Sequence, residues 1–203
     1  YVKDNQKIFK RTFDIITDEL SKNGIFIINE TQLDEYQKEY ARKLFIKDIY
    51  PTLQIMMLSK NNKLSNLNDG SIYLSVCLSR NSSKESNQFA IIEIQSGLLG
   101  RFIVLPPRNN QTFIIRLDDI IRSNLDYIFG VFGYTYFEAY TFKLTRDAEI
   151  DLLTDVSKSF LDIVSESILQ RKSGRPVRFI YDKKMPAPMF EALFSKLKIL
   201  LRV

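Results

Sequence analysis

The chain has 203 residues, of which 45% are hydrophobic and 26% charged, and its formal net charge is +5. This composition is that of a soluble globular protein, large enough to bury one good core or two small ones. No apolar run approaches the roughly 20 residues that span a bilayer, and the single cysteine, Cys77, excludes an internal disulfide and a cysteine-cluster metal site.

The first expected element is a helix from about Asn5 to Lys22. Its apolar residues recur at helical spacing: Phe9, Phe13, Ile16 and Leu20. Gly24 favours a left-handed helix end, and a short apolar strand, Ile25 to Ile28, follows. A second helix is expected to take Thr31 as its cap and to end before Pro51. The stretch from Asn61 to Gly70 is typical of a loop.

In the middle of the chain, the spacing of apolar residues changes to every second residue. From Ser71 to Ser79, apolar and small or polar residues alternate, which predicts a strand with one apolar face. Three further strands are expected: Phe89 to Ile94, Arg101 to Leu105 and Thr112 to Ile115. Because the connections between them are short, antiparallel neighbours are favoured.

The last third alternates helices and strands. The expected elements are a helix from Asp118 to Ile128, a strand from Tyr134 to Thr145, a helix from Thr154 to Lys172, a strand from Val177 to Tyr181 and a helix from Pro186 to Leu200. The whole pattern predicts an α+β fold, with a mainly antiparallel sheet and helices packed on it as a two-layer sandwich. No linker is visible, so we expect residues 1–203 to form a single domain.

Positive charge gathers near the C-terminal end. Between Arg171 and Lys184 there are six basic side chains and one acidic one, Asp182. Lys and Arg are ordinary in the last turn of a helix, which accounts for Arg171 and Lys172. It does not account for the other four: Arg175, Arg178, Lys183 and Lys184. The segment therefore predicts a surface that attracts polyanions.

The carboxylates allow two interpretations. Asp147, Glu149 and Asp151, together with the pair Asp118-Asp119, offer the oxygen ligands that Mg²⁺ prefers. Both groups also stand where a helix begins, where negative charge is favourable without any metal. No glycine-rich phosphate loop followed by Lys-Ser or Lys-Thr is present. Two tyrosines, Tyr136 and Tyr140, can serve either a core edge or a contact surface.

Several segments together resemble the middle domain of bacterial polyphosphate kinase. The segments are Arg101-Phe102-Ile103-Val104-Leu105-Pro106, Leu117-Asp118-Asp119-Ile120-Ile121 with Asn124-Leu125, Phe142-Lys143-Leu144-Thr145-Arg146-Asp147-Ala148 and Arg171-Lys172-Ser173-Gly174-Arg175-Pro176-Val177-Arg178. Two features depart from the family pattern. Gln54 to Gly70 lacks the usual His-Pro-Phe-Pro segment, and Lys143 stands where arginine is usual.

The resemblance implies a role within a phosphotransferase. That family moves the terminal phosphate of ATP onto polyphosphate through a phosphohistidine, whereas this chain contains no histidine. It implies an inactive middle domain, with no catalytic, cofactor or metal site of its own, while ATP and Mg²⁺ serve the parent enzyme. The expected partners are the polyphosphate chain, the flanking N-terminal and catalytic C-terminal domains, and a second copy in a homo-oligomer. We expect a cytoplasmic fragment of a longer protein.

Three hypotheses for function remain open at this point. The first is a polyphosphate kinase middle domain that supplies dimer contacts and a basic channel wall. The second is a module that binds nucleic acid or another polyanion, and the third is a metal-dependent phosphotransfer enzyme. The candidate phosphate contacts are Arg146, Arg175 and Arg178, with Arg101 and Lys143 behind them, because an arginine fork can hold two phosphate oxygens. Arg146 has a competing role, pairing with a neighbouring carboxylate.

Overall fold

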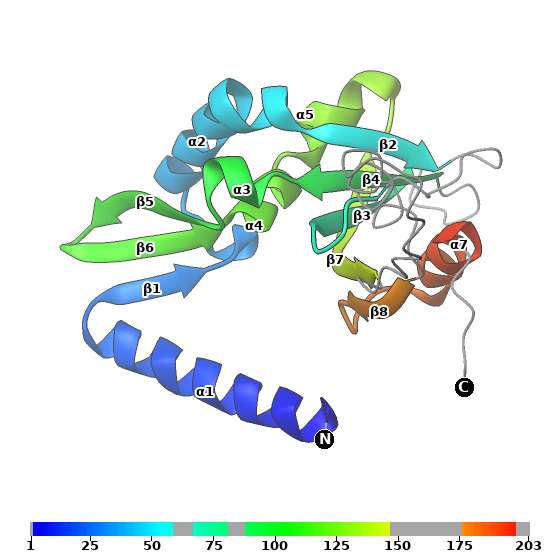
Figure 1. The fold of residues 1–203 in the computed structure, drawn as a ribbon. Helices are drawn as coiled ribbons and strands as arrows, with labels where there is room; N and C mark the ends of the chain where they lie inside the picture. Colours follow the sequence, from blue (N-terminus) through cyan, green and yellow to red (C-terminus); the bar gives the residue numbers. More distant parts are fainter. Residues whose placement is uncertain (1, 59–66, 81–87, 147–175, 198–203) are drawn as a thin grey trace, which may run out of the picture. The chain divides into compact units, whose positions relative to one another are not determined.

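A computed structural model describes residues 2–58, 67–80, 88–146 and 176–197. The chain forms two compact units, and each is built from two separate stretches of sequence. The first unit contains Tyr1–Thr52 and Gln95–Ile128, and the second contains Leu53–Ile94 and Phe129–Val203. Figure 1 follows the elements in chain order.

The first unit is built on a three-stranded sheet in the order β1-β6-β5. Its strands are β1 (Ile25–Ile28), β5 (Phe102–Arg108) and β6 (Gln111–Arg116). β5 and β6 form an antiparallel hairpin, whereas β1 pairs with β6 in parallel. Gly24 turns the chain into β1 with a φ of +73°, which a residue without Cβ adopts at no steric cost. Its carbonyl then accepts the Thr112 backbone N–H at 2.8 Å.

Helical segments precede, separate and follow these three strands along the sequence. They are α1 (Val2–Lys22), η1 (Glu30–Gln32), α2 (Glu35–Leu44), η2 (Phe45–Ile49), η3 (Tyr50–Thr52), α3 (Ser96–Leu99), α4 (Leu117–Arg122) and α5 (Leu125–Phe129). The prediction that Thr31 caps the second helix is wrong, because Thr31 lies inside η1 and each of the two helical segments has its own capping box. Asn29 caps the short 3-10 turn η1, and Asp34 caps α2 by accepting the Gln37 backbone N–H at 2.8 Å.

The second unit contains a five-stranded sheet in the order β2-β4-β3-β7-β8, and all of its pairings are antiparallel. The strands are β2 (Gln54–Leu58), β3 (Ile72–Ser79), β4 (Gln88–Ile94), β7 (Tyr136–Arg146) and β8 (Pro176–Tyr181). The turn η5 (Gly130–Phe132) precedes β7, and helix α7 (Ala187–Leu197) follows β8. The helix expected from Thr154 to Lys172 lies outside the described residues.

The core of the second unit lies between α7 and one face of the sheet. Met189, Leu193 and Leu197 of α7 are buried in one cluster with side chains of β3 and β7, among them Tyr73 and Phe142. From Tyr73 to Ser79 every side chain of β3 is buried, including Leu74 at 0% exposure. The sequence predicted one apolar face for this strand, but β3 is central in its sheet and is buried on both faces.

The α+β class with mainly antiparallel sheet is confirmed, but the strands divide into two sheets rather than one. The prediction of a single domain over residues 1–203 stays a prediction. β2 was not predicted, and the expected helix from Asp118 to Ile128 is interrupted at Ser123-Asn124. Within the described ranges, no helix is both long and apolar enough to cross a membrane.

Candidate functional site

Two of the predicted basic residues lie on one face of the five-stranded sheet. Lys143 of β7 pairs in register with Ile180 of β8, and Thr145 pairs with Arg178. Residues opposite each other in an antiparallel pair point to the same side, and so do residues two apart on one strand. Lys143 and Arg178 therefore share the face that points away from α7.

The solvent exposure of this basic pair differs from that of its neighbours on the strands. Phe142 and Leu144, on either side of Lys143, are buried in the core under α7. Lys143 itself is half-buried and Arg178 is exposed. β8 is the edge strand of this sheet, so Arg178 lies at the edge and Lys143 lies on the neighbouring strand β7.

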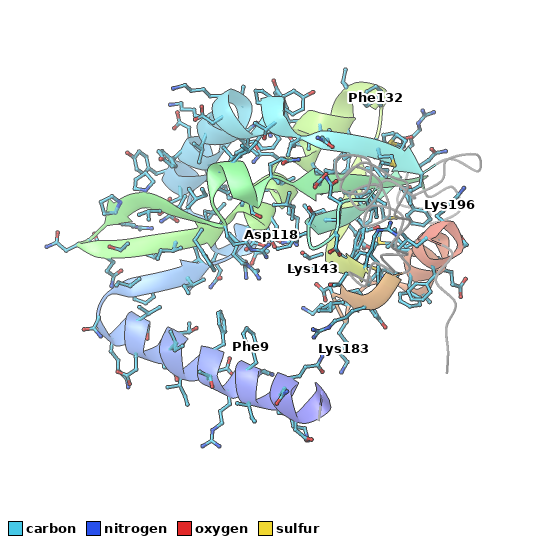
Figure 2. All side chains as sticks on the ribbon, in the orientation of Figure 1. Phe9, Asp118, Phe132, Lys143, Lys183 and Lys196 are labelled. Carbon is cyan, nitrogen blue, oxygen red and sulfur yellow. The ribbon has the colours of Figure 1, made fainter. Side chains whose placement is uncertain are left out.

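Two more cations come from the turn between β8 and α7. Lys183 and Lys184 are both exposed there, and the Lys184 backbone N–H donates to Asp182 Oδ1 at 2.9 Å. Figure 2 labels Lys143 on β7 and Lys183 in this turn. Besides Arg146 at the end of β7, four of the basic residues singled out by the sequence thus belong to β7, β8 and the turn that follows β8. Arg175 lies outside the described residues.

Arg146 has a different environment, although it is on the same strand as Lys143. A register shift separates it from Thr145, and its exposure is 7%. Its backbone N–H donates to Asp69 Oδ1 at 2.6 Å, which ties the loop before β3 to the end of β7. A side chain this buried is poorly placed to meet a long polyanion from solvent.

A polar cluster lies around the Tyr73 hydroxyl in the same unit. The hydroxyl accepts the Asn68 backbone N–H at 2.7 Å, and the Asn68 amide donates to both Glu93 carboxylate oxygens at 2.9 and 3.1 Å. Burial and the nearby Glu93 charge raise the pKa of Tyr73 to about 12, although Arg146 acts in the opposite direction. The cluster holds the loop at Asn68 against the sheet, and its groups satisfy one another.

Arg101 lies in the first unit, in an ion pair with a buried carboxylate. Its Nη2 is 3.2 Å from Oδ1 of Asp118, whose side chain is 2% exposed. Asp119 next to it is bound by Arg116 at 2.9 Å and by Arg122. Burial raises the pKa of Asp119 even though both arginines act to lower it. The pair Asp118-Asp119, one of the two candidate magnesium groups, therefore contacts arginines.

The other metal candidates, Asp147, Glu149 and Asp151, lie outside the described residues. In the part of the chain that the structure describes, no three His, Cys, Asp or Glu residues gather closely enough to hold a metal ion. Tyr136 and Tyr140, which the sequence left open, both donate hydrogen bonds to Glu138, and Tyr140 does so at 3.2 Å. Burial is the main cause that raises the pKa of Tyr140 to about 12.

A hollow of about 720 Å³ in the first unit was missed by sequence reasoning. It is lined by Glu30, Glu35, Lys38, Glu39, Arg42, Ser123, Asn124 and Asp126. The guanidinium of Arg42 donates to both Asp126 carboxylate oxygens at 2.9 and 3.2 Å and lies 4.8 Å from the centre of the Tyr127 ring. These partners already occupy the guanidinium, so Arg42 is less suited to a polyanion than Lys143 and Arg178.

Comparison with known proteins gives a consistent result. A family model described as the polyphosphate kinase middle domain matches residues 36–201. The polyphosphate kinases of Vibrio parahaemolyticus serotype O3:K6 and Vibrio cholerae serotype O1 are 36% and 38% identical to this chain over 195 residues. Each match covers 94% of this chain but only 28% and 27%, respectively, of the relative. The chain therefore spans little more than a quarter of these relatives.

A solved structure is similar as well. The crystal structure of polyphosphate kinase from Porphyromonas gingivalis matches with a TM-score of 0.76 and 26% sequence identity. The match covers 98% of this chain and 28% of that chain. The similarity includes both compact units, since it extends over nearly every residue.

Proposed function

Because the chain belongs to the polyphosphate kinase family, as its middle domain, we propose that it forms part of the basic wall along which polyphosphate passes in a parent enzyme. That enzyme transfers the terminal phosphate of ATP to polyphosphate. The observation that supports this role is the position of Lys143 and Arg178 on one face of the two neighbouring strands β7 and β8, of which β8 is the edge strand. Lys183 and Lys184 extend the positive charge beyond β8.

The chemistry of these side chains suits a chain of phosphates. An arginine fork can hold two oxygens of one phosphate, while a lysine ammonium acts as a compact charge that tolerates sliding. Arg178 is exposed and belongs to no ion pair that involves a described carboxylate at close range. Arg146 and Arg101 are assigned structural roles in this proposal, because one is buried and the other is paired with Asp118.

ATP and Mg²⁺ are proposed to act elsewhere in the parent enzyme. The described residues provide no group that fits a magnesium ion, and the chain has no histidine to carry a phosphoryl group. No step of phosphoryl transfer is therefore assigned to this chain. Its partners are proposed to be polyphosphate, the flanking domains and a second copy in a cytoplasmic homo-oligomer.

One surface is suited to the dimer contacts. Val131 and Phe132, neighbours in the η5 turn, are 82% and 64% exposed. The Gly133 backbone N–H closes this turn on the Gly130 carbonyl at 2.9 Å, with a φ of +77° at Gly133. The turn therefore holds two apolar side chains out in solvent, and we assign them to the contact with a second copy.

The test of the channel wall is a binding titration. The double variant Lys143→Ala with Arg178→Ala should bind long polyphosphate more weakly, and the slope of log affinity against log salt should flatten by about two, one for each phosphate contact. A matched control, Lys10→Ala with Lys47→Ala, removes the same charge from exposed positions of the first unit. It should leave the slope almost unchanged.

Two results would contradict the proposal. The first is an equal loss of affinity in the control and in the Lys143 and Arg178 variant, since net charge alone would then explain binding. The second is competition by single-stranded RNA at the same affinity per phosphate, which would favour the alternative of a general polyanion-binding module.

A further inference from the structure

The turn between β8 and α7 is held at both of its ends. At its start, the Asp182 backbone N–H donates to the Thr141 carbonyl of β7 at 2.9 Å. At its end, the Met185 backbone N–H donates to the Asp182 carbonyl at 2.9 Å, and the Met185 side chain is buried in the cluster that α7 forms with the sheet. Lys183 and Lys184 are the two residues between these anchors, and both are exposed.

The Asp182 side chain restrains the turn further. Its Oδ1 accepts the Lys184 backbone N–H at 2.9 Å, which is a bond from a side chain to the backbone two residues on. Asp and Asn both form such Asx-turns. A segment that is ordered before its ligand arrives binds more tightly, because less conformational freedom is lost on binding. The bond therefore fixes the backbone from which the two lysines project.

The charge of Asp182 acts in the opposite direction. Asp182 is the one acidic residue among six basic ones between Arg171 and Lys184, and it is exposed. A carboxylate beside two lysines repels a chain of phosphates, whereas an asparagine would accept the same backbone hydrogen bond without a charge. The carboxylate therefore orders the turn and at the same time weakens its attraction for an anion.

We infer that Asp182 is a positioning residue for polyphosphate binding. Its side-chain bond to the Lys184 backbone orders the turn, and its charge weakens binding at Lys183 and Lys184 so that a phosphate chain can move along them. Asp182 itself does not contact phosphate. The inference rests on the proposed function, because the turn extends the basic surface that Lys143 and Arg178 form.

Two variants of equal charge separate the two effects. Asp182→Asn keeps an oxygen that accepts the Lys184 N–H, whereas Asp182→Ala loses it, and each change removes one negative charge. In titrations of the 203-residue chain with long polyphosphate, Asp182→Asn should bind about twofold more tightly than the original chain, which is the effect of one charge screened by water. Asp182→Ala should bind about fivefold more weakly than Asp182→Asn, because the turn must then be ordered on binding.

The difference between the two variants should depend on the lysines. When Lys183→Ala and Lys184→Ala are added to each variant, the difference in affinity should disappear. Hydrogen exchange gives a second readout that needs no ligand. The Lys184 amide should exchange several times faster in Asp182→Ala than in the original chain or in Asp182→Asn. Urea midpoints of both variants should stay close to that of the original chain, since the backbone bonds and the buried Met185 remain.

Three results would overturn the inference. Equal affinity of Asp182→Asn and Asp182→Ala would mean that Asp182 acts only as a charge. Equal exchange of the Lys184 amide in the three chains would mean that the turn does not depend on the side-chain bond. A difference in affinity that persists without the two lysines would mean that Asp182 acts on some other group.

These failures can be distinguished from failure of the proposed function. If the Lys143 and Arg178 variant loses affinity as expected while the Asp182 variants bind equally, the channel wall stands and only the inference about Asp182 is wrong. If the original chain does not bind polyphosphate, the proposed function is wrong, and the inference fails with it.

Discussion

Replacing Arg101 with alanine is expected to destabilise the first unit. The change removes one ion-pair partner of Asp118, whose side chain is 2% exposed, while the Arg101 side chain is 28% exposed. The charge of Arg116 also acts on Asp118, so part of the compensation remains. Removing one partner of a fully buried ion pair costs about 3 to 5 kcal/mol, because it leaves the other charge uncompensated. Since Arg101 keeps partial contact with water, we expect the loss of unfolding free energy to be about 2 to 3 kcal/mol.

A urea titration followed by circular dichroism measures this loss. With a denaturant slope of roughly 2 kcal/mol per molar, the midpoint should fall by about 1 to 1.5 M. The matched control is Arg108→Ala, which breaks an ion pair with Asp34 whose nitrogen and oxygen are 2.6 Å apart. That pair is shorter, but its side chains are 61% and 29% exposed, so its loss should cost less than about 1 kcal/mol.

The comparison separates burial from distance as the cause of stability. Equal midpoint shifts for Arg101→Ala and Arg108→Ala would refute the argument that the burial of Asp118 decides the energy. An Arg101→Ala variant with unchanged stability and weakened polyphosphate binding would refute the structural assignment altogether. Arg101 would then be the phosphate contact that the sequence predicted.

Two further changes test the second unit and the dimer contacts. Tyr73→Phe should cost about 1 to 2 kcal/mol at pH 7 in urea titrations, since the Asn68 backbone N–H loses its acceptor. The folded protein keeps the Tyr73 proton up to about pH 12 whereas an unfolded tyrosine loses it near pH 10, so stability in the original chain should fall between these values. The variant should lack that part of the alkaline loss, and an unchanged pH profile would contradict the raised pKa. Val131→Asp with Phe132→Asp should shift the parent enzyme toward monomer in light scattering; an unchanged mass would exclude the η5 turn from the interface.

Helices and strands whose apolar residues recur at a clear spacing could be predicted from the sequence. β3 and β7 alternate apolar and polar residues, and α7 has its inward residues at helical spacing, so each was found with ends close to those observed. β2 was missed because Gln54-Ile55-Met56-Met57-Leu58 contains no alternation and only one β-branched residue, Ile55. It is specified by pairing with β4, which is a tertiary contact that the local sequence does not contain.

The hollow around Arg42 could not be predicted from the sequence, for a similar reason. Arg42 on α2 contacts Asn124 and Asp126, which are 82 and 84 residues away along the chain. Each of these residues alone is an ordinary polar residue of a helix or its end. Their convergence depends on the path of the chain between the two stretches that build the first unit, and no spacing rule encodes that path.

The roles of the basic residues cannot be assigned from the number of charges in a segment. Lys143 and Arg146 are three residues apart on one strand, and both were candidate phosphate contacts, although Lys143 stands where the family usually has arginine. The side of the sheet on which each lies follows from strand register, and a shift in register separates Thr145 from Arg146. Arg146 is thereby buried and ties the strand end to Asp69, whereas Lys143 shares its face with Arg178. A role in binding polyphosphate therefore has to be argued from register and exposure, because one basic residue of β7 has a structural role while another on the same strand is open to an anion.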